Sequence, residues 1–171
     1  MKLVLVTLWT IVMCGLAGAQ ESIKDRAVSV GPWQIDASFT EARKFDRCVM
    51  SYTTADGIKA QFTRDASGLS LVLTSPRWEL EKGVSYPVEF AAGSTKWKSD
   101  VAATNNVVRI SLTDKNFNAA LKRANTLEIR AARSTIAVPL KKSAAALARL
   151  ERCYESNNKA AETNPFAAPK P

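Results

Sequence analysis

Short segments in which apolar and polar residues alternate fill the chain between residues 33 and 140, and this pattern narrows the choice of fold more than any other feature. In residues 84–90, for example, every second residue is Val, Tyr or Phe, as on one face of a half-buried strand. Turn sequences such as Ala55-Asp56-Gly57 and Asp65-Ala66-Ser67-Gly68 separate the segments. The short connections leave no room for the crossover helices of a parallel sheet. We therefore predict a mainly β fold, an antiparallel β-sandwich of about nine strands.

Two helices complete the predicted fold. Residues 143–154 begin with a serine suited to capping, contain no Gly or Pro, and repeat apolar residues at three- and four-residue steps. Cys153 belongs to this apolar stripe, so we expect it to face the sheet. Asp114 is placed to cap a short helix that runs to Leu121. We predict a single domain at residues 31–156, with the C-terminal helix packed on the sandwich.

The first residues have the pattern of an export signal. Met1-Lys2 is a short basic start, residues 3–16 are apolar, and Ala17-Gly18-Ala19 offers the small residues that signal peptidase requires. We predict a signal peptide at residues 1–19 that is cleaved near Ala19-Gln20. The mature protein would then be periplasmic or secreted.

A transmembrane anchor is the alternative for this leader. It needs about 20 apolar residues, and Cys14-Gly15 and Gly18 interrupt the run. No later segment is long and apolar enough, so we expect no transmembrane segment in the mature chain. We also predict a flexible lead-in at residues 20–30 and a disordered tail at residues 157–171, which is rich in Asn, Ala and Pro.

Cleavage of the leader leaves two cysteines, Cys48 in a predicted strand and Cys153 in the C-terminal helix. In an oxidising compartment two cysteines most simply form one disulfide, and we predict the bond Cys48–Cys153. In the chain-entropy model, closing so long a loop stabilises a fold by roughly 4 to 5 kcal/mol. The alternative is two separate buried thiols.

The formal net charge is +8, and the basic excess lies in the last third of the chain. Residues 115–152 hold nine Lys or Arg and two acids, whereas residues 20–114 hold twelve of each sign. A shared basic surface would attract polyanions, which outside the cytoplasm are anionic lipid, lipopolysaccharide or acidic polysaccharide. The candidate polyanion-binding residues are Arg130, Lys141, Lys142, Arg149 and Arg152.

The alternative to such a site is a solvated basic surface that has no ligand of its own. Nucleic acid would bind in a similarly salt-dependent way. Because the leader directs the chain out of the cytosol, we do not expect nucleic acid to be a physiological partner.

Histidine is absent from the chain, which removes several classes of site. The usual Ser-His-Asp and Cys-His arrangements cannot be built, and zinc sites that use imidazole are excluded. The glycines are isolated, so the sequence has no phosphate-binding loop. We predict no catalytic residue, no metal site and no cofactor.

Two other patterns leave an alternative open. Paired carboxylates serve glycosidases, but Glu79 and Glu81 fit the solvated face of a strand, and Asp36 could meet Glu89 only through the fold. Indole rings also stack on sugars, yet each tryptophan of the mature chain is in phase with apolar neighbours, which favours core packing. These tryptophans are Trp33, Trp78 and Trp97.

Three motifs follow one another along the chain: Gly31-Pro32-Trp33-Gln34-Ile35, Trp78 with Gly83-Val84, and Ile136-Ala137-Val138-Pro139-Leu140 followed by Ala145-Ala146-Leu147. Together with the exported start, they resemble the invasion-associated locus B family of bacterial envelope proteins. The resemblance implies a small, exported, β-rich protein without known catalysis, in a family linked to bacterial entry into host cells. That family usually has a cysteine where this chain has Ala37, and more than one disulfide. No site residues carry over, because the matching positions are structural.

We therefore expect a non-enzymatic exported envelope protein that acts by binding. Its role would be associated with invasion, or with recognition of anionic envelope or host-surface material through the basic C-terminal third. A second hypothesis is an inhibitor or accessory subunit of an envelope enzyme, which would form a stable complex with that enzyme. A third, ranked below these, is a histidine-free carboxylate hydrolase.

Overall fold

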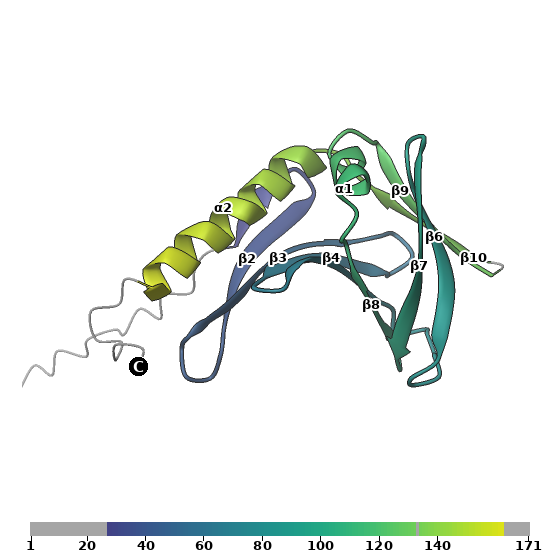
Figure 1. Cartoon of the computed structure of the whole chain (residues 1–171), viewed down its shortest axis with the longest axis horizontal. Helices are drawn as coiled ribbons and strands as arrows, with labels where there is room; N and C mark the ends of the chain where they lie inside the picture. The colour runs from purple at the N-terminus through teal and green to yellow at the C-terminus, as the bar shows by residue number, and fades with distance from the viewer. Residues whose placement is uncertain (1–26, 133, 163–171) are drawn as a thin grey trace, which may run out of the picture.

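The computed structural model describes residues 27–132 and 134–162 of the 171-residue chain. Its mainly β architecture, with one short internal helix and a C-terminal helix, confirms the predicted fold class (Figure 1). The elements are β1 (Val28–Val30), β2 (Trp33–Phe39), β3 (Phe45–Thr53), β4 (Lys59–Asp65), β5 (Gly68–Thr74), β6 (Ser85–Ala92), β7 (Thr95–Thr104), β8 (Val107–Ser111), α1 (Lys115–Leu121), β9 (Thr126–Ala131), β10 (Ser134–Pro139) and α2 (Ser143–Glu162). The predicted signal peptide lies outside the described residues.

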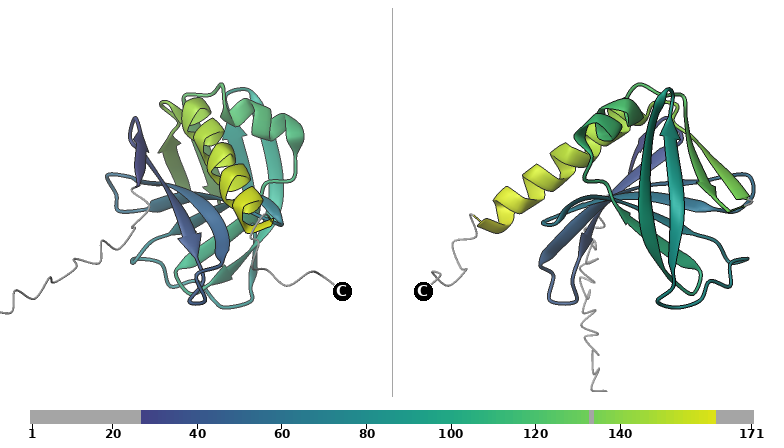
Figure 2. Two further views of the ribbon diagram at one scale, coloured as in Figure 1. Left: turned by 90° about the vertical axis from the view of Figure 1, so that its left-hand side faces the viewer. Right: turned by 45° about the vertical axis from the view of Figure 1, so that its right-hand side comes forward.

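The strands form one antiparallel sheet with the order β1-β2-β3-β4-β5-β8-β7-β6-β9-β10. The sheet bends sharply at β7, which pairs with β6 over residues 95–102 and with β8 only at Ala103 and Thr104. The half that contains β2 to β5 therefore stands at a steep angle to the half that contains β6, β9 and β10 (Figure 2). The result is a sandwich-like open sheet.

The alternation seen in the sequence places one row of apolar side chains along each inner face. In the first half, neighbouring strands bring five buried residues into register, each exposed by 3% or less: Ile35, Met50, Phe62, Leu71 and Ile110. In the second half, Phe90 lies opposite both Trp97 and Ile129. Each fully buried side chain of this size stabilises the fold by about 1.5–3 kcal/mol. The two rows make one continuous core.

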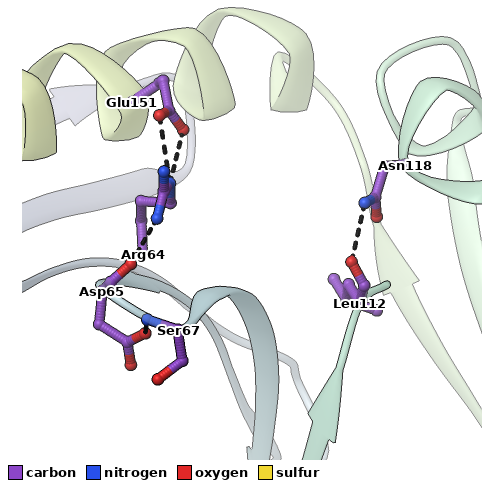
Figure 3. Close-up of polar contacts among 6 residues, drawn as sticks. All are labelled: Arg64, Asp65, Ser67, Leu112, Asn118 and Glu151. Carbon is purple, nitrogen blue, oxygen red and sulfur yellow. Dashed lines mark hydrogen bonds and ion pairs between the residues drawn. The ribbon is translucent and has the colours of Figure 1, made fainter. Parts of the chain in front are cut away.

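Helix α1 fills one end of the space between the two halves. The Asp114 carboxylate caps it by accepting from the Phe117 N–H at 2.7 Å, as predicted. Asn118 anchors the same turn by donating its side-chain N–H to the Leu112 carbonyl (Figure 3). The Phe117 ring lies 5.5 Å from that of Trp97 and 6.2 Å from that of Phe90, measured between ring centres. The short helix is thus built into the core.

Helix α2 lies across β2, β3 and β4 (Figure 1). Its buried stripe includes Ala146, Leu150 and Cys153, in agreement with the predicted orientation. Cys153 is bonded to Cys48 of β3, which confirms the predicted disulfide across 105 residues of chain. The hydroxyl of Ser143, the first residue of α2, donates to the carbonyl of Leu121 at 3.0 Å and so joins the two helices.

The prediction was wrong at two boundaries. Residues 157–162 continue α2 instead of beginning a tail, because Lys159-Ala160-Ala161-Glu162 favours helix and no proline lies between Pro139 and Pro165. The last three residues of the predicted flexible lead-in form β1, which pairs with β2 as a hairpin. Residues 163–171 and the earlier part of the lead-in lie outside the described residues.

The two-residue hairpin Gly31-Pro32 packs against the start of α2. Gly31 has a φ of +60°, and a Cβ at this position would come within 2.9 Å of the Lys142 Cγ. The indole N–H of the next residue, Trp33, donates to the carbonyl of Lys141 at 3.1 Å. The Gly-Pro-Trp motif therefore contacts the two residues that precede the helix.

We expect Gly31→Ala to destabilise the protein more than Gly57→Ala does. Both positions have positive φ, which costs a non-glycine residue about 1–2 kcal/mol. Only Gly31 also has a neighbour in the way, since nothing lies within 4 Å of a Cβ built at Gly57. Urea unfolding of the two variants measures the difference. Equal losses of unfolding free energy would contradict the contact between the hairpin and the helix.

Candidate functional site

Four of the five candidate polyanion-binding residues lie at the start of α2 or along it. Lys141 and Lys142 directly precede the helix, and both are exposed. Arg149 and Arg152 are three residues apart on α2, so they project from the same side. Arg152 is exposed and Arg149 is half-buried. We call these four residues the basic flank.

An acidic residue of the same helix is held on another side. Glu151 pairs with Arg64 of β4, whose Nε lies 3.1 Å from both carboxylate oxygens (Figure 3). The same guanidinium lies 4.3 Å from the centre of the Tyr154 ring. The salt bridges found within residues 27–132 and 134–162 do not involve the basic flank. Its positive charge is therefore available to an external anion.

Arg130, the fifth candidate, is separate from the basic flank. It stands on β9, where its guanidinium forms ion pairs with Glu128 and with Glu89 of β6. Lys96 and Lys98 of β7 approach the same Glu89 carboxylate, at 3.2 and 3.9 Å. The structure thus places Arg130 in a mixed-charge cluster on the outer face of the second half of the sheet.

This cluster lowers the pKa of the Glu89 carboxyl. The hydrogen bond from Lys96 is the main cause, and the positive charges of Lys96, Lys98 and Arg130 act in the same direction. Partial burial opposes them. A general acid requires a raised pKa, so this environment does not suit Glu89 to that role.

The other carboxylates proposed for catalysis are not brought together. Residues 77–82, predicted to include a strand, instead form a loop with a single bridge between Leu80 and Asn105, and Glu79 and Glu81 are exposed on it. Asp36 lies on β2, in the half of the sheet that does not contain Glu89. In the described part of the chain, no three Cys, Asp or Glu residues are grouped so as to hold a metal ion.

The tryptophans have three different surroundings. Trp33 is fully buried against Tyr52 and Phe62, and Trp97 packs on Phe90. These two support the prediction of core packing. Trp78 is half-buried and lines an apolar cavity of about 300 Å³ between the two halves of the sheet.

Sequence reasoning missed this cavity. Its walls come from the same alternating apolar positions that build the core, so periodicity cannot tell a filled space from a hollow one. No helix within the described residues has the length and apolar character needed to span a bilayer.

We predict that Glu89→Gln destabilises the protein at neutral pH and that the difference from the wild type shrinks in acid. The folded-state pKa lies below the ordinary value of 4.5, so the carboxylate contributes stability above that pH. This contribution to stability is lost as the pH falls through the lowered folded-state pKa of Glu89. Urea unfolding at several pH values measures it, with the exposed Glu79→Gln as control. A difference independent of pH would contradict the assignment.

Comparison with known proteins supports the fold. No protein-family model matches the sequence, and no curated protein matches it. Among solved structures, the chain is similar to the crystal structure of invasion associated protein B from Bartonella henselae. The match has a TM-score of 0.57 and 21% sequence identity, and covers 77% of this chain and 98% of that one. The resemblance inferred from the sequence motifs is therefore confirmed at the level of the fold.

Proposed function

We propose that the protein is a non-enzymatic exported protein of the bacterial envelope that binds anionic surface material through the basic flank, Lys141, Lys142, Arg149 and Arg152. The observation that carries this proposal is that two of these residues directly precede α2 and two lie on one side of it, outside the ion pairs found among the described residues. Phosphate, sulfate and carboxylate groups are the chemistry that such a surface attracts.

The location outside the cytosol rests on two features. The first residues have the pattern of an export signal, and the described part of the chain contains a disulfide, Cys48–Cys153. Disulfides of this kind form and persist in oxidising compartments. A protein exported in this way meets anionic lipid, lipopolysaccharide and acidic polysaccharide.

The fold similarity supports an envelope role. That solved structure is of an invasion associated protein, and the present chain shares its fold over nearly the whole of that structure. On this basis the proposal extends to anionic host-surface material as well as the envelope itself. The absence of histidine, which excludes the usual Ser-His-Asp and Cys-His arrangements, favours binding over catalysis.

Reversing two charges of the flank tests the proposal. Each basic side chain near an anionic surface contributes about 1 kcal/mol, so Arg149→Glu with Arg152→Glu should weaken binding to phosphatidylglycerol vesicles by at least ~30-fold. Raising the salt concentration should weaken wild-type binding as well. Sedimentation with vesicles measures both effects, and lipopolysaccharide and heparin serve as further arms.

The matched control is Lys59→Glu with Lys82→Glu, which changes the net charge equally at exposed positions on β4 and before β6. This control should retain most of the binding. Equal losses in the two double variants would show that only net charge matters, which contradicts a dedicated flank. A stable complex with an envelope enzyme, unaffected by the flank variant, would favour the inhibitor or accessory role instead.

A further inference from the structure

The space between the two halves of the bent sheet is filled at one end by α1 and is hollow farther along the strands. The hollow has a volume of about 300 Å³. Its floor consists of buried side chains from five strands: Leu73, Val88, Phe90, Val101, Ile110 and Ile129. Half-buried Trp78, Tyr86, Ala131 and Ile136 form its rim. We propose that this cavity binds the aliphatic chain of an amphipathic, lipid-like molecule.

The chemistry of the lining supports an aliphatic ligand. No charged side chain lines the cavity, and its floor is formed by branched aliphatic residues and one phenylalanine. The polar groups belong to Ser134, Trp78 and Tyr86, and the Tyr86 hydroxyl is already in contact with the Glu81 N–H at 3.3 Å. Rings such as Trp and Tyr suit a boundary that is apolar on one side and wet on the other. They would lie where a polar head group leaves the cavity.

The volume sets the length of the chain. An engineered cavity of ~150 Å³ holds benzene, so a cavity of twice that volume has room for about ten to twelve carbon atoms. This size is at the lower end of the range for small-molecule sites, ~300–1,000 Å³. A single saturated chain fits, whereas a two-chain lipid would leave one chain outside.

The exposure of the lining favours a slender ligand over a protein partner. Only Ala132 and Ser134 of the lining are exposed, and none of its large apolar residues is. A stable protein interface buries at least ~1,200 Å² in total, and so little exposed apolar surface cannot supply its core. The apolar area lies within the hollow, where only a narrow group can reach it.

The inference does not depend on the basic flank, because the cavity and α2 contact different parts of the sheet. The cavity is lined by residues of β5 to β10 and of the loop before β6, whereas α2 packs on β2 to β4. Charge reversal at Arg149 and Arg152 should therefore leave chain binding unchanged. If the protein binds anionic vesicles but no detergent chain, this inference fails and the proposed function stands. If it binds the chain but not the vesicles, the proposed function fails and this inference stands.

A series of nonionic detergents tests the inference on the wild-type protein. Hexyl, octyl, decyl, dodecyl and tetradecyl maltoside, each below its micelle concentration, are titrated by calorimetry. Burial of each methylene should tighten binding by about fourfold, until the cavity is full at about ten to twelve carbons. The heat-capacity change on binding should be negative. Affinity that does not vary with chain length, or no binding at all, would overturn the proposal.

A variant that fills the cavity, compared with a matched control, locates the binding site. Ala131→Phe should weaken decyl maltoside binding at least tenfold, whereas Ala137→Phe, at an exposed position on neighbouring β10, should not. Circular dichroism checks that each variant folds, and Val108→Trp replaces Ala131→Phe if that variant does not. Wild-type affinity in a folded cavity-filling variant would contradict the assignment. A dimer in light scattering that does not bind detergent would assign the hollow to a second copy.

Discussion

The disulfide between Cys48 and Cys153 is the constraint on which the rest of the structure depends. It ties the C-terminal helix to a central strand of the first half of the sheet, across 105 residues of chain. Neighbouring contacts reinforce the attachment, notably the ion pair between Arg64 and Glu151 beside it. Because loop closure removes conformations from the unfolded chain, one covalent bond stabilises a sheet that is open on one side.

Once α2 is fixed, the remaining features have separate places. The helix covers the first half of the sheet and carries the basic flank toward solvent. Helix α1 fills one end of the space between the halves, and the apolar cavity occupies a region farther along the strands. The fold thus carries two regions of opposite character, a basic stretch at α2 and an apolar cavity, for which we propose an anionic and an aliphatic ligand respectively.

Much of the fold could be predicted from local patterns. Alternation and turn residues predicted the strands, capping predicted α1, and an apolar stripe placed Cys153 against the sheet. The extent of α2 was missed because the helix continues through a polar segment that has no apolar stripe. The strand Val28–Val30 was missed because it forms by pairing with β2, which its own short sequence does not indicate. The location of Arg130 could not be predicted either, since its acidic partners, Glu89 and Glu128, are set by strand pairing. The cavity was invisible because its walls and the core share one periodicity.

Equilibrium unfolding in urea of the double variant Cys48→Ala with Cys153→Ala, compared with the oxidised wild type, tests the central claim most directly. Removing a native disulfide from a small secreted domain typically lowers the free energy of unfolding by about 2–5 kcal/mol. A loss of this size, accompanied by faster hydrogen exchange in α2 than in β6, is the result that the structure predicts. Unchanged stability and unchanged protection of α2 would show that the helix is held without the bond and would contradict the account.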